Sequence, residues 1–158
     1  LNEALPTLFA ENVVGTSTVM ARRDALQNAS GFDEALHSAE DWDLWLRLAA
    51  VGPVAFSGRV LCDYLMRPGS ETSKAEARLS AIDEIIRRHE GAVVTLRPVA
   101  VRRARARLMV GRAEARRAEG DARGALAAHL RAFTLAPSLR TLRSALADGG
   151  RMLLSGEG

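Results

Sequence analysis

Apolar side chains recur at helical spacing through most of residues 74–146, and this periodicity restricts the second half of the chain to an all-α fold. The predicted helices span 74–89, 99–119, 122–135 and 138–146. The stops between them are local: Glu90-Gly91 ends the first helix, Gly120 forms a turn, and Pro137 precedes a last helix capped by Ser138. The short connections predict antiparallel neighbours.

Small and turn-forming residues fall at regular places within this region. They are Ala113, Gly120, Ala125, Ala132 and Pro137. With this pattern the segment at about 106–139 resembles one tetratricopeptide repeat. A single repeat cannot bury its apolar face alone, so the flanking helices would have to cover it. A generic helical hairpin explains the same spacing equally well, and both interpretations stay open.

The charge of the chain changes sign at the turn-rich segment 68–73. Residues 1–73 hold five Arg and ten acids, whereas residues 74–158 hold seventeen basic residues and nine acids. We therefore predict two units, 1–73 and 74–158. A dense arginine group contains Arg97, Arg102, Arg103, Arg105, Arg107, Arg112, Arg116 and Arg117. No aromatic residues interleave them, so we expect a solvated face and no nucleic-acid partner.

The first unit is predicted to be an α/β fragment. β-Branched and apolar runs predict strands over 12–20, 54–56 and 60–66. A short helix is expected over 21–28, with Gly31 as its left-handed stop. Three short strands and two helices make a thin core, so we expect this unit to need a partner sheet and to expose an apolar edge. Cys62 lies in an apolar run and is expected to be buried and inert.

Residues 38–48 concentrate three carboxylates and both tryptophans at the start of a predicted helix that runs to about residue 51. Ser38 and Asp41 form an S-x-x-D pattern, which predicts that the helix begins at Ser38. Asp43 and Arg47 have the spacing of a helix ion pair. On these residues alone, capping is the favoured role of Asp41. A carboxylate in a first turn is also well placed to meet a substrate.

Four motifs follow one another in the first unit. They are Thr18–Arg23, Gly31–Glu34, Glu40–Leu48, and Tyr64 with Arg67–Ser73. Their order and spacing resemble the acceptor-side, C-terminal half of family 2 glycosyltransferases of the GT-A fold, over about residues 10–73. The resemblance implies a partial GT-A domain with few strands, followed by the helical tail. We expect a chain that is helix-dominated overall.

The resemblance also implies a chemistry. Asp41 matches the general base of an inverting transfer, which takes the proton from an acceptor hydroxyl as that oxygen attacks the anomeric carbon of a nucleotide-sugar. Glu40 matches the acid that precedes this base. The acceptor site would be lined by Gly31, Phe32, Asp33 and Trp42. Trp45, at helical spacing, is expected in the core, and solvation of Asp33 in a loop is as good an interpretation as acceptor contact.

The sequence departs from the family pattern in two ways. The family's nucleotide-binding half is absent: no strand–helix series precedes Asn12, and that part of the chain has no Asp-x-Asp pair to hold a metal and the donor diphosphate. Arg67 stands where many relatives carry histidine; it could pair with a diphosphate but cannot bind a metal. A divalent metal, Mg²⁺ or Mn²⁺, is therefore expected only in a full-length enzyme. We expect this chain alone to be inactive.

Two functions remain open at this stage. The first is the C-terminal part of a glycosyltransferase that uses a nucleotide-sugar donor and a hydroxyl acceptor. The second is a non-catalytic helical interaction module that carries a transferase remnant and binds a protein through its tail. No apolar run has the length of a membrane span and no signal peptide opens the chain, so we expect a cytoplasmic location with at most peripheral contact at the inner membrane face.

Overall fold

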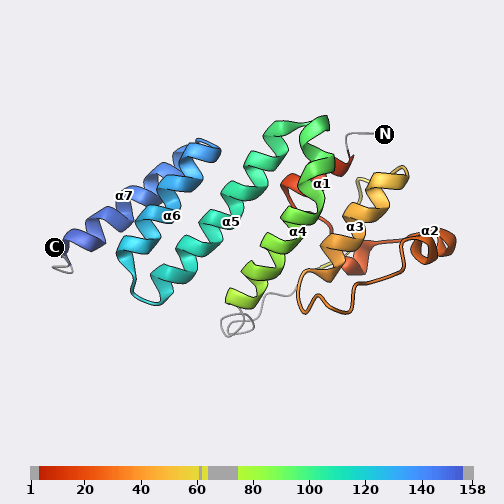
Figure 1. Ribbon diagram of the computed structural model, residues 1–158, viewed down its shortest axis with the longest axis horizontal. Helices are drawn as coiled ribbons and strands as arrows, with labels where there is room; N and C mark the ends of the chain where they lie inside the picture. The colour runs from red at the N-terminus through yellow and green to blue at the C-terminus, as the bar shows by residue number, and fades with distance from the viewer. Residues whose placement is uncertain (1–3, 61, 64–74, 155–158) are drawn as a thin grey trace.

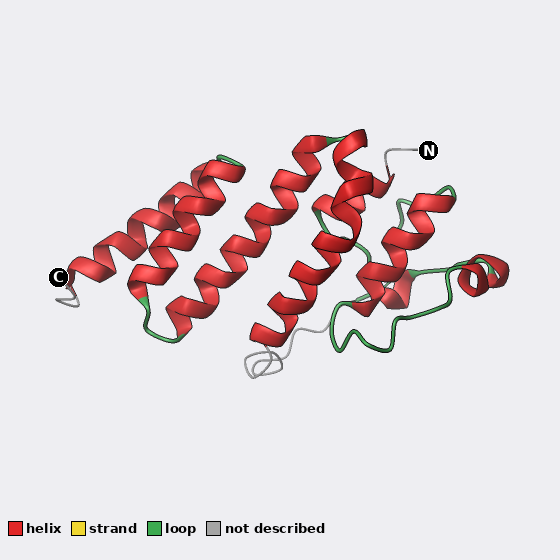
Figure 2. Cartoon of the chain, viewed as in Figure 1, coloured by secondary structure: helices red, strands yellow, loops and turns green. Residues whose placement is uncertain are grey.

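The computed structural model describes residues 4–60, 62–63 and 75–154. Within these residues the chain is helix-dominated, as expected, and contains no strand (Figure 2). The helices are α1 (Ala4–Ala10), the 3₁₀ helix η1 (Thr16–Thr18), α2 (Arg23–Asn28), α3 (Glu40–Val51), α4 (Ala75–Leu96), α5 (Pro98–Ala118), α6 (Ala122–Leu135) and α7 (Leu139–Leu154).

Helices α4 to α7 form a row in which each helix packs beside the next in chain order (Figure 1). Very short connections force antiparallel neighbours: Arg97 alone separates α4 from α5, and three residues separate each later pair. Pro98 opens α5, where its missing N–H costs nothing. Gly120 turns the chain into α6 with a φ of +83°, and Asp121 caps α6 by accepting a hydrogen bond from the Gly124 N–H.

One hydrophobic core joins the N-terminal region to the helix row. Short helix α1 packs against α3, α4 and α5 (Figure 1). The core residues include Leu5, Leu8, Phe9, Trp42, Leu46, Ile85, Ile86, Val93, Ala104 and Leu108. Side chains from both sides of the predicted boundary at residue 73 therefore share one core. Gly111 of α5 allows close packing, because a Cβ there would lie 2.7 Å from Leu79 Cδ2 of α4.

The strands predicted over 12–20 and 54–56 are loops in the structure, apart from η1. Of the segment 60–66, the described residues 60, 62 and 63 are likewise not in a strand. A strand is stable only when a neighbouring strand receives its backbone hydrogen bonds, and none is supplied within the described residues. The α/β part of the expected fold is therefore absent from the part of the chain that the structure describes.

Several helix ends also differ from expectation. Helix α3 begins at Glu40 and not at Ser38; its N-cap is Ala39, with a φ of +59°, and no side chain caps it. Helix α4 continues through Gly91 to Leu96 because Val93, beyond the glycine, is fully buried. Helix α7 passes residue 146 and runs to Leu154. Its predicted N-cap is confirmed, since Ser138 Oγ accepts the Thr141 N–H.

Apolar side chains stand exposed around the first unit. Met20, Val51, Phe56 and Val60 are all largely open to solvent. They lie on α3 and on loops, so the apolar edge expected of a unit with strands stays a prediction. Cys62 is exposed, so the prediction of a buried thiol is wrong. The described neighbours Val60 and Asp63 are exposed as well.

Candidate functional site

The start of α3 presents the predicted base. Asp41 is half-buried, and its Oδ2 accepts a hydrogen bond from the Thr16 hydroxyl at 2.8 Å. The other oxygen, Oδ1, accepts the backbone N–H of Trp42 at 2.6 Å. Glu40, one residue earlier, is exposed. The Asp41 carboxylate thus keeps a fixed orientation through two local donors while its surroundings remain open to solvent.

Asp43 lies one turn into the same helix and is the buried anchor of the region, with only 2% of its surface exposed. Its Oδ2 accepts Arg47 Nε at 2.8 Å, and its Oδ1 is 2.9 Å from Nε2 of His89 on α4. The predicted helix pair is therefore present. It is also the centre of a link between α3 and α4, because His89 comes from the helix row.

Arg47 extends from this anchor to the loop after α2. Its Nη1 donates to the backbone carbonyl of Ala29, and its Nη2 donates to the carbonyl of Gly31 at 2.8 Å. Gly31 adopts a φ of +64°, which glycine tolerates without strain, and its N–H bonds to the Leu26 carbonyl. One guanidinium thus ties the loop at 29–31 to α3.

The two residues after Gly31 are also held. Phe32 is half-exposed and meets the edge of the buried Trp45 ring, with centroids 6.3 Å apart. Asp33 Oδ2 accepts Arg88 Nη1 of α4 at 2.6 Å, while Asp33 Oδ1 accepts the Ala35 N–H. The hydrogen bond from Arg88, followed by the one from Ala35, lowers the pKa of Asp33 from its usual value. Asp33 is therefore an ion-pair partner and not a freely solvated loop residue.

Trp42, unlike Gly31, Phe32 and Asp33, is buried. Its side chain is 5% exposed, packs against Phe9, and donates from Nε1 to the Leu8 carbonyl at 2.8 Å. The expectation that Trp42 lines the acceptor site is wrong for this structure, because its ring lies in the core that joins α1 to α3. Trp45 is buried, as predicted. Arg67 lies outside the described residues.

The structure therefore gathers part of the predicted set. Gly31, Phe32 and Asp33 form a restrained loop beside α3, and Asp41 stands at the start of that helix. The sequence interpretation missed His89, Arg88 and Thr16, which come from other elements. No pattern of local spacing points to them, since His89 is 46 residues from Asp43 and Thr16 is 25 from Asp41.

The arginine group predicted as a solvated face is largely engaged in ion pairs. Arg105 binds Glu90, Arg112 binds Asp83, and Arg117 binds Asp148. Two further pairs are Arg107 with Glu11, and Arg116 with Asp121. These pairs join neighbouring segments and use much of the positive charge internally. Among the described residues, no group of three or more His, Cys, Asp and Glu side chains could hold a metal ion.

A second buried carboxylate, Asp148, joins α5, α6 and α7 and is fully shielded from solvent. It accepts Arg117 Nε at 2.8 Å and Arg151 Nη1 at 3.1 Å, and it lies 2.7 Å from His129 Nδ1. Burial alone would raise the pKa of Asp148. Hydrogen bonds from Arg117 and His129 outweigh that effect, and the pKa is lowered.

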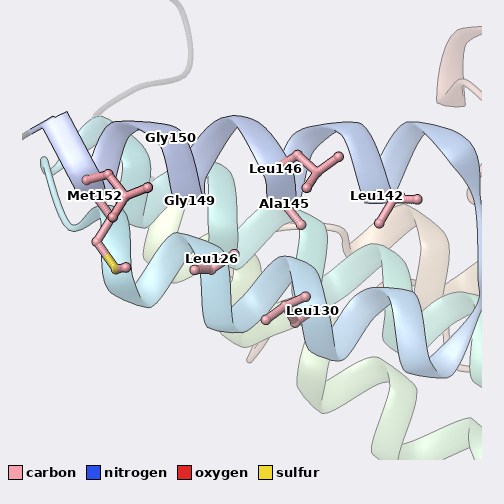
Figure 3. Close-up of a pocket in the computed structure, with 9 residues that line it drawn as sticks. Leu126, Leu130, Leu142, Ala145, Leu146, Gly149, Gly150 and Met152 are labelled. Atoms are coloured by element: carbon pink, nitrogen blue, oxygen red, sulfur yellow. The ribbon is translucent and has the colours of Figure 1, made fainter.

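A groove runs between α6 and α7 at the end of the helix row (Figure 3). Its volume is about 490 Å³, and leucines from both helices line it: Leu126 and Leu130 from α6, and Leu142 and Leu146 from α7. The close-up shows these side chains along the open side of the helix pair. The lining is almost wholly apolar, so the groove can bind an apolar surface but offers no chemistry of its own.

Comparison with known proteins finds no matching family model, no matching curated protein and no matching solved structure. None of the described helices has both the length and the apolar character needed to cross a membrane.

Proposed function

We propose that the region around α2 and α3 is the acceptor-binding part of an inverting glycosyltransferase, with Asp41 as its general base. The observation that carries this proposal is the clamp formed by Asp43 and Arg47. It holds the loop at 29–31 against α3 by bonds to two backbone carbonyls. A loop fixed in this way beside a half-exposed carboxylate is what positioning of an acceptor hydroxyl requires.

The roles follow from this placement. Asp41 receives the proton of the acceptor hydroxyl as the C–O bond to the anomeric carbon forms and the bond to the nucleotide diphosphate breaks. Thr16 orients the carboxylate by donating to Oδ2. Glu40 and the loop at 31–33 contact the acceptor. The nucleotide-sugar and any Mg²⁺ or Mn²⁺ would be bound by a donor half that is not among the described residues.

The test uses the natural polypeptide that contains this chain, assayed with a panel of nucleotide-sugars and hydroxyl acceptors in Mg²⁺ or Mn²⁺. We expect Asp41→Asn to lower kcat by about 10²- to 10⁴-fold, because an amide cannot accept the proton. Donor binding, followed by fluorescence or calorimetry, should stay unchanged. Glu119→Gln is the control, since Glu119 is exposed at the end of α5 and lies outside α2 and α3.

Two results would overturn the proposal. An Asp41→Asn variant with unchanged kcat would show that Asp41 is not the general base. Failure of the unsubstituted polypeptide to transfer any sugar in the panel would favour the non-catalytic alternative.

A further inference from the structure

On the α7 side, the groove is continuous with a leucine stripe that the helix row leaves uncovered. Leu139, Leu146 and Leu153 are spaced by seven residues and are 81%, 68% and 79% exposed. Leu142 lies three residues after Leu139, at the second apolar position of a heptad. Gly149 follows in the corresponding place of the next heptad and adds no side chain. This is the spacing by which one helix packs along another.

The pair of helices α6 and α7 carries a net positive charge. Residues 122–154 contain five arginines and a single acid, Asp148. Asp148 is buried and already accepts hydrogen bonds from Arg117 and Arg151. Arg123 is spaced three and seven residues before Leu126 and Leu130, so it shares their side of α6. Arg143 follows Leu142 directly and borders the stripe on α7. Both arginines are exposed.

We propose that the α6–α7 groove binds an acidic amphipathic helix of a partner protein. The leucine stripe and the groove take the apolar side of the partner, and Arg123 and Arg143 meet carboxylates along its flanks. A second copy of the same face would oppose arginine with arginine. A flat bilayer would touch Leu139, Leu146 and Leu153 but would not fill the hollow between the helices. The inference holds whether or not the chain transfers a sugar.

The test uses the full chain and two synthetic helical peptides of about three heptads, with Leu at positions a and d. One peptide carries Glu at e and g, and the other carries Lys there. Fluorescence anisotropy of the labelled peptides gives Kd. We expect the Glu peptide to bind at least about tenfold more tightly than the Lys peptide, with an affinity that falls as salt rises.

Matched variants locate the binding face. Leu146→Asp should weaken binding of the Glu peptide by about tenfold or more, and Arg143→Glu should reduce the preference for Glu over Lys. Val51→Asp is the control, because Val51 is 79% exposed but lies on α3. Circular dichroism should show the same helix content in all three variants, since each substitution is at the surface.

Contrary results are equally specific. Equal Kd values for the two peptides, or Glu-peptide binding unaffected by Leu146→Asp, would overturn the proposal. The proposal would also be overturned if the chain sedimented with vesicles of phosphatidylcholine and phosphatidylserine but bound neither peptide. A concentration-dependent dimer that Leu146→Asp abolishes would assign the face to self-association instead.

Discussion

A buried aspartate bonds to an arginine and a histidine near each end of the molecule. One aspartate connects helices to one another, whereas the other also connects a helix to a loop. Asp148 joins three helices of the row, and its partners Arg117, His129 and Arg151 all lie on helices. Asp43 joins α3 to α4, and its partner Arg47 continues to the carbonyls of a loop. The same chemistry thus fixes a scaffold at one end and a candidate site at the other.

The difference shows what a buried charge contributes in each place. Burying a carboxylate is costly, and ion partners compensate only when the geometry is good. In the helix row the hydrophobic periodicity already specifies the packing, so Asp148 adds a contact to a fold that other forces determine. Helix α3 packs into the core, but neither α2 nor the loop at 29–31 contains a buried residue. The Asp43–Arg47 clamp is therefore the restraint that ties this loop to α3.

The largest expected effect is loss of either anchor. Asp43→Asn and Asp148→Asn should each lower the free energy of unfolding by about 3 kcal/mol, because each removes the buried carboxylate that serves as counter-charge to partly buried arginine and histidine partners. Urea denaturation followed by circular dichroism measures this. Glu119→Gln, an exposed change at the end of α5, should stay within about 0.5 kcal/mol. A loss below about 1 kcal/mol at either aspartate would show that burial and pairing there nearly cancel.

Removing the Arg47 guanidinium should lower the free energy of unfolding by a smaller amount. Arg47→Met keeps an unbranched apolar stem but loses the bonds to Asp43, Ala29 and Gly31. We expect a loss of about 2 kcal/mol, which is typical of hydrogen bonds that involve a charged group. The same denaturation experiment measures it. No loss of stability would mean that the loop at 29–31 is held by other contacts.

The pH dependence of stability should separate Asp148 from an ordinary surface acid. Its pKa in the folded chain is lowered from the usual 3.8. The corresponding stabilisation is therefore complete above about pH 4 and is lost as the pH falls further, through the folded pKa. Urea midpoints between pH 5 and pH 2 should show wild type and Asp148→Asn converging at the acid end. A gap that stays constant across this range would contradict the lowered pKa.

The smallest effect is expected at the uncovered stripe of α7. Leu146 is 68% exposed, so Leu146→Ala removes little buried surface and should change the free energy of unfolding by less than about 0.5 kcal/mol. Thermal unfolding provides the measurement. A loss of 2 kcal/mol or more would show that α7 is covered within the free chain and that its stripe is not available to a partner.

Local signals were sufficient for much of the helix row. Helix α6 runs from Ala122 to Leu135 as predicted, because Gly120 and Asp121 start it and Pro137 lies just beyond its end. The end of α4 was misjudged at Gly91, since burial of Val93 on the far side outweighs the roughly 1 kcal/mol that a glycine costs a helix. Local rules lose accuracy where packing decides the outcome.

The first unit was predicted less well because its structure depends on distant partners. The runs at 12–20 and 54–56 have the composition of strands. A strand also needs a neighbouring strand for its backbone hydrogen bonds, and composition does not reveal whether one is present. The Asp43–Arg47 pair was visible from its spacing, whereas its burial and its bond to His89 were not. Trp42 was assigned to the acceptor site by resemblance, and its contact with Leu8 places it in the core instead.

The most direct test of the clamp is hydrogen exchange at the Ser30 and Gly31 amides, which bond to the carbonyls of Gln27 and Leu26. Arg47→Met should accelerate exchange at these two amides by at least about tenfold, while Arg117→Met, the matched change in the helix row, should leave them unaltered. If both variants change the two amides equally, or if Arg47→Met leaves them protected, Arg47 does not hold the candidate site.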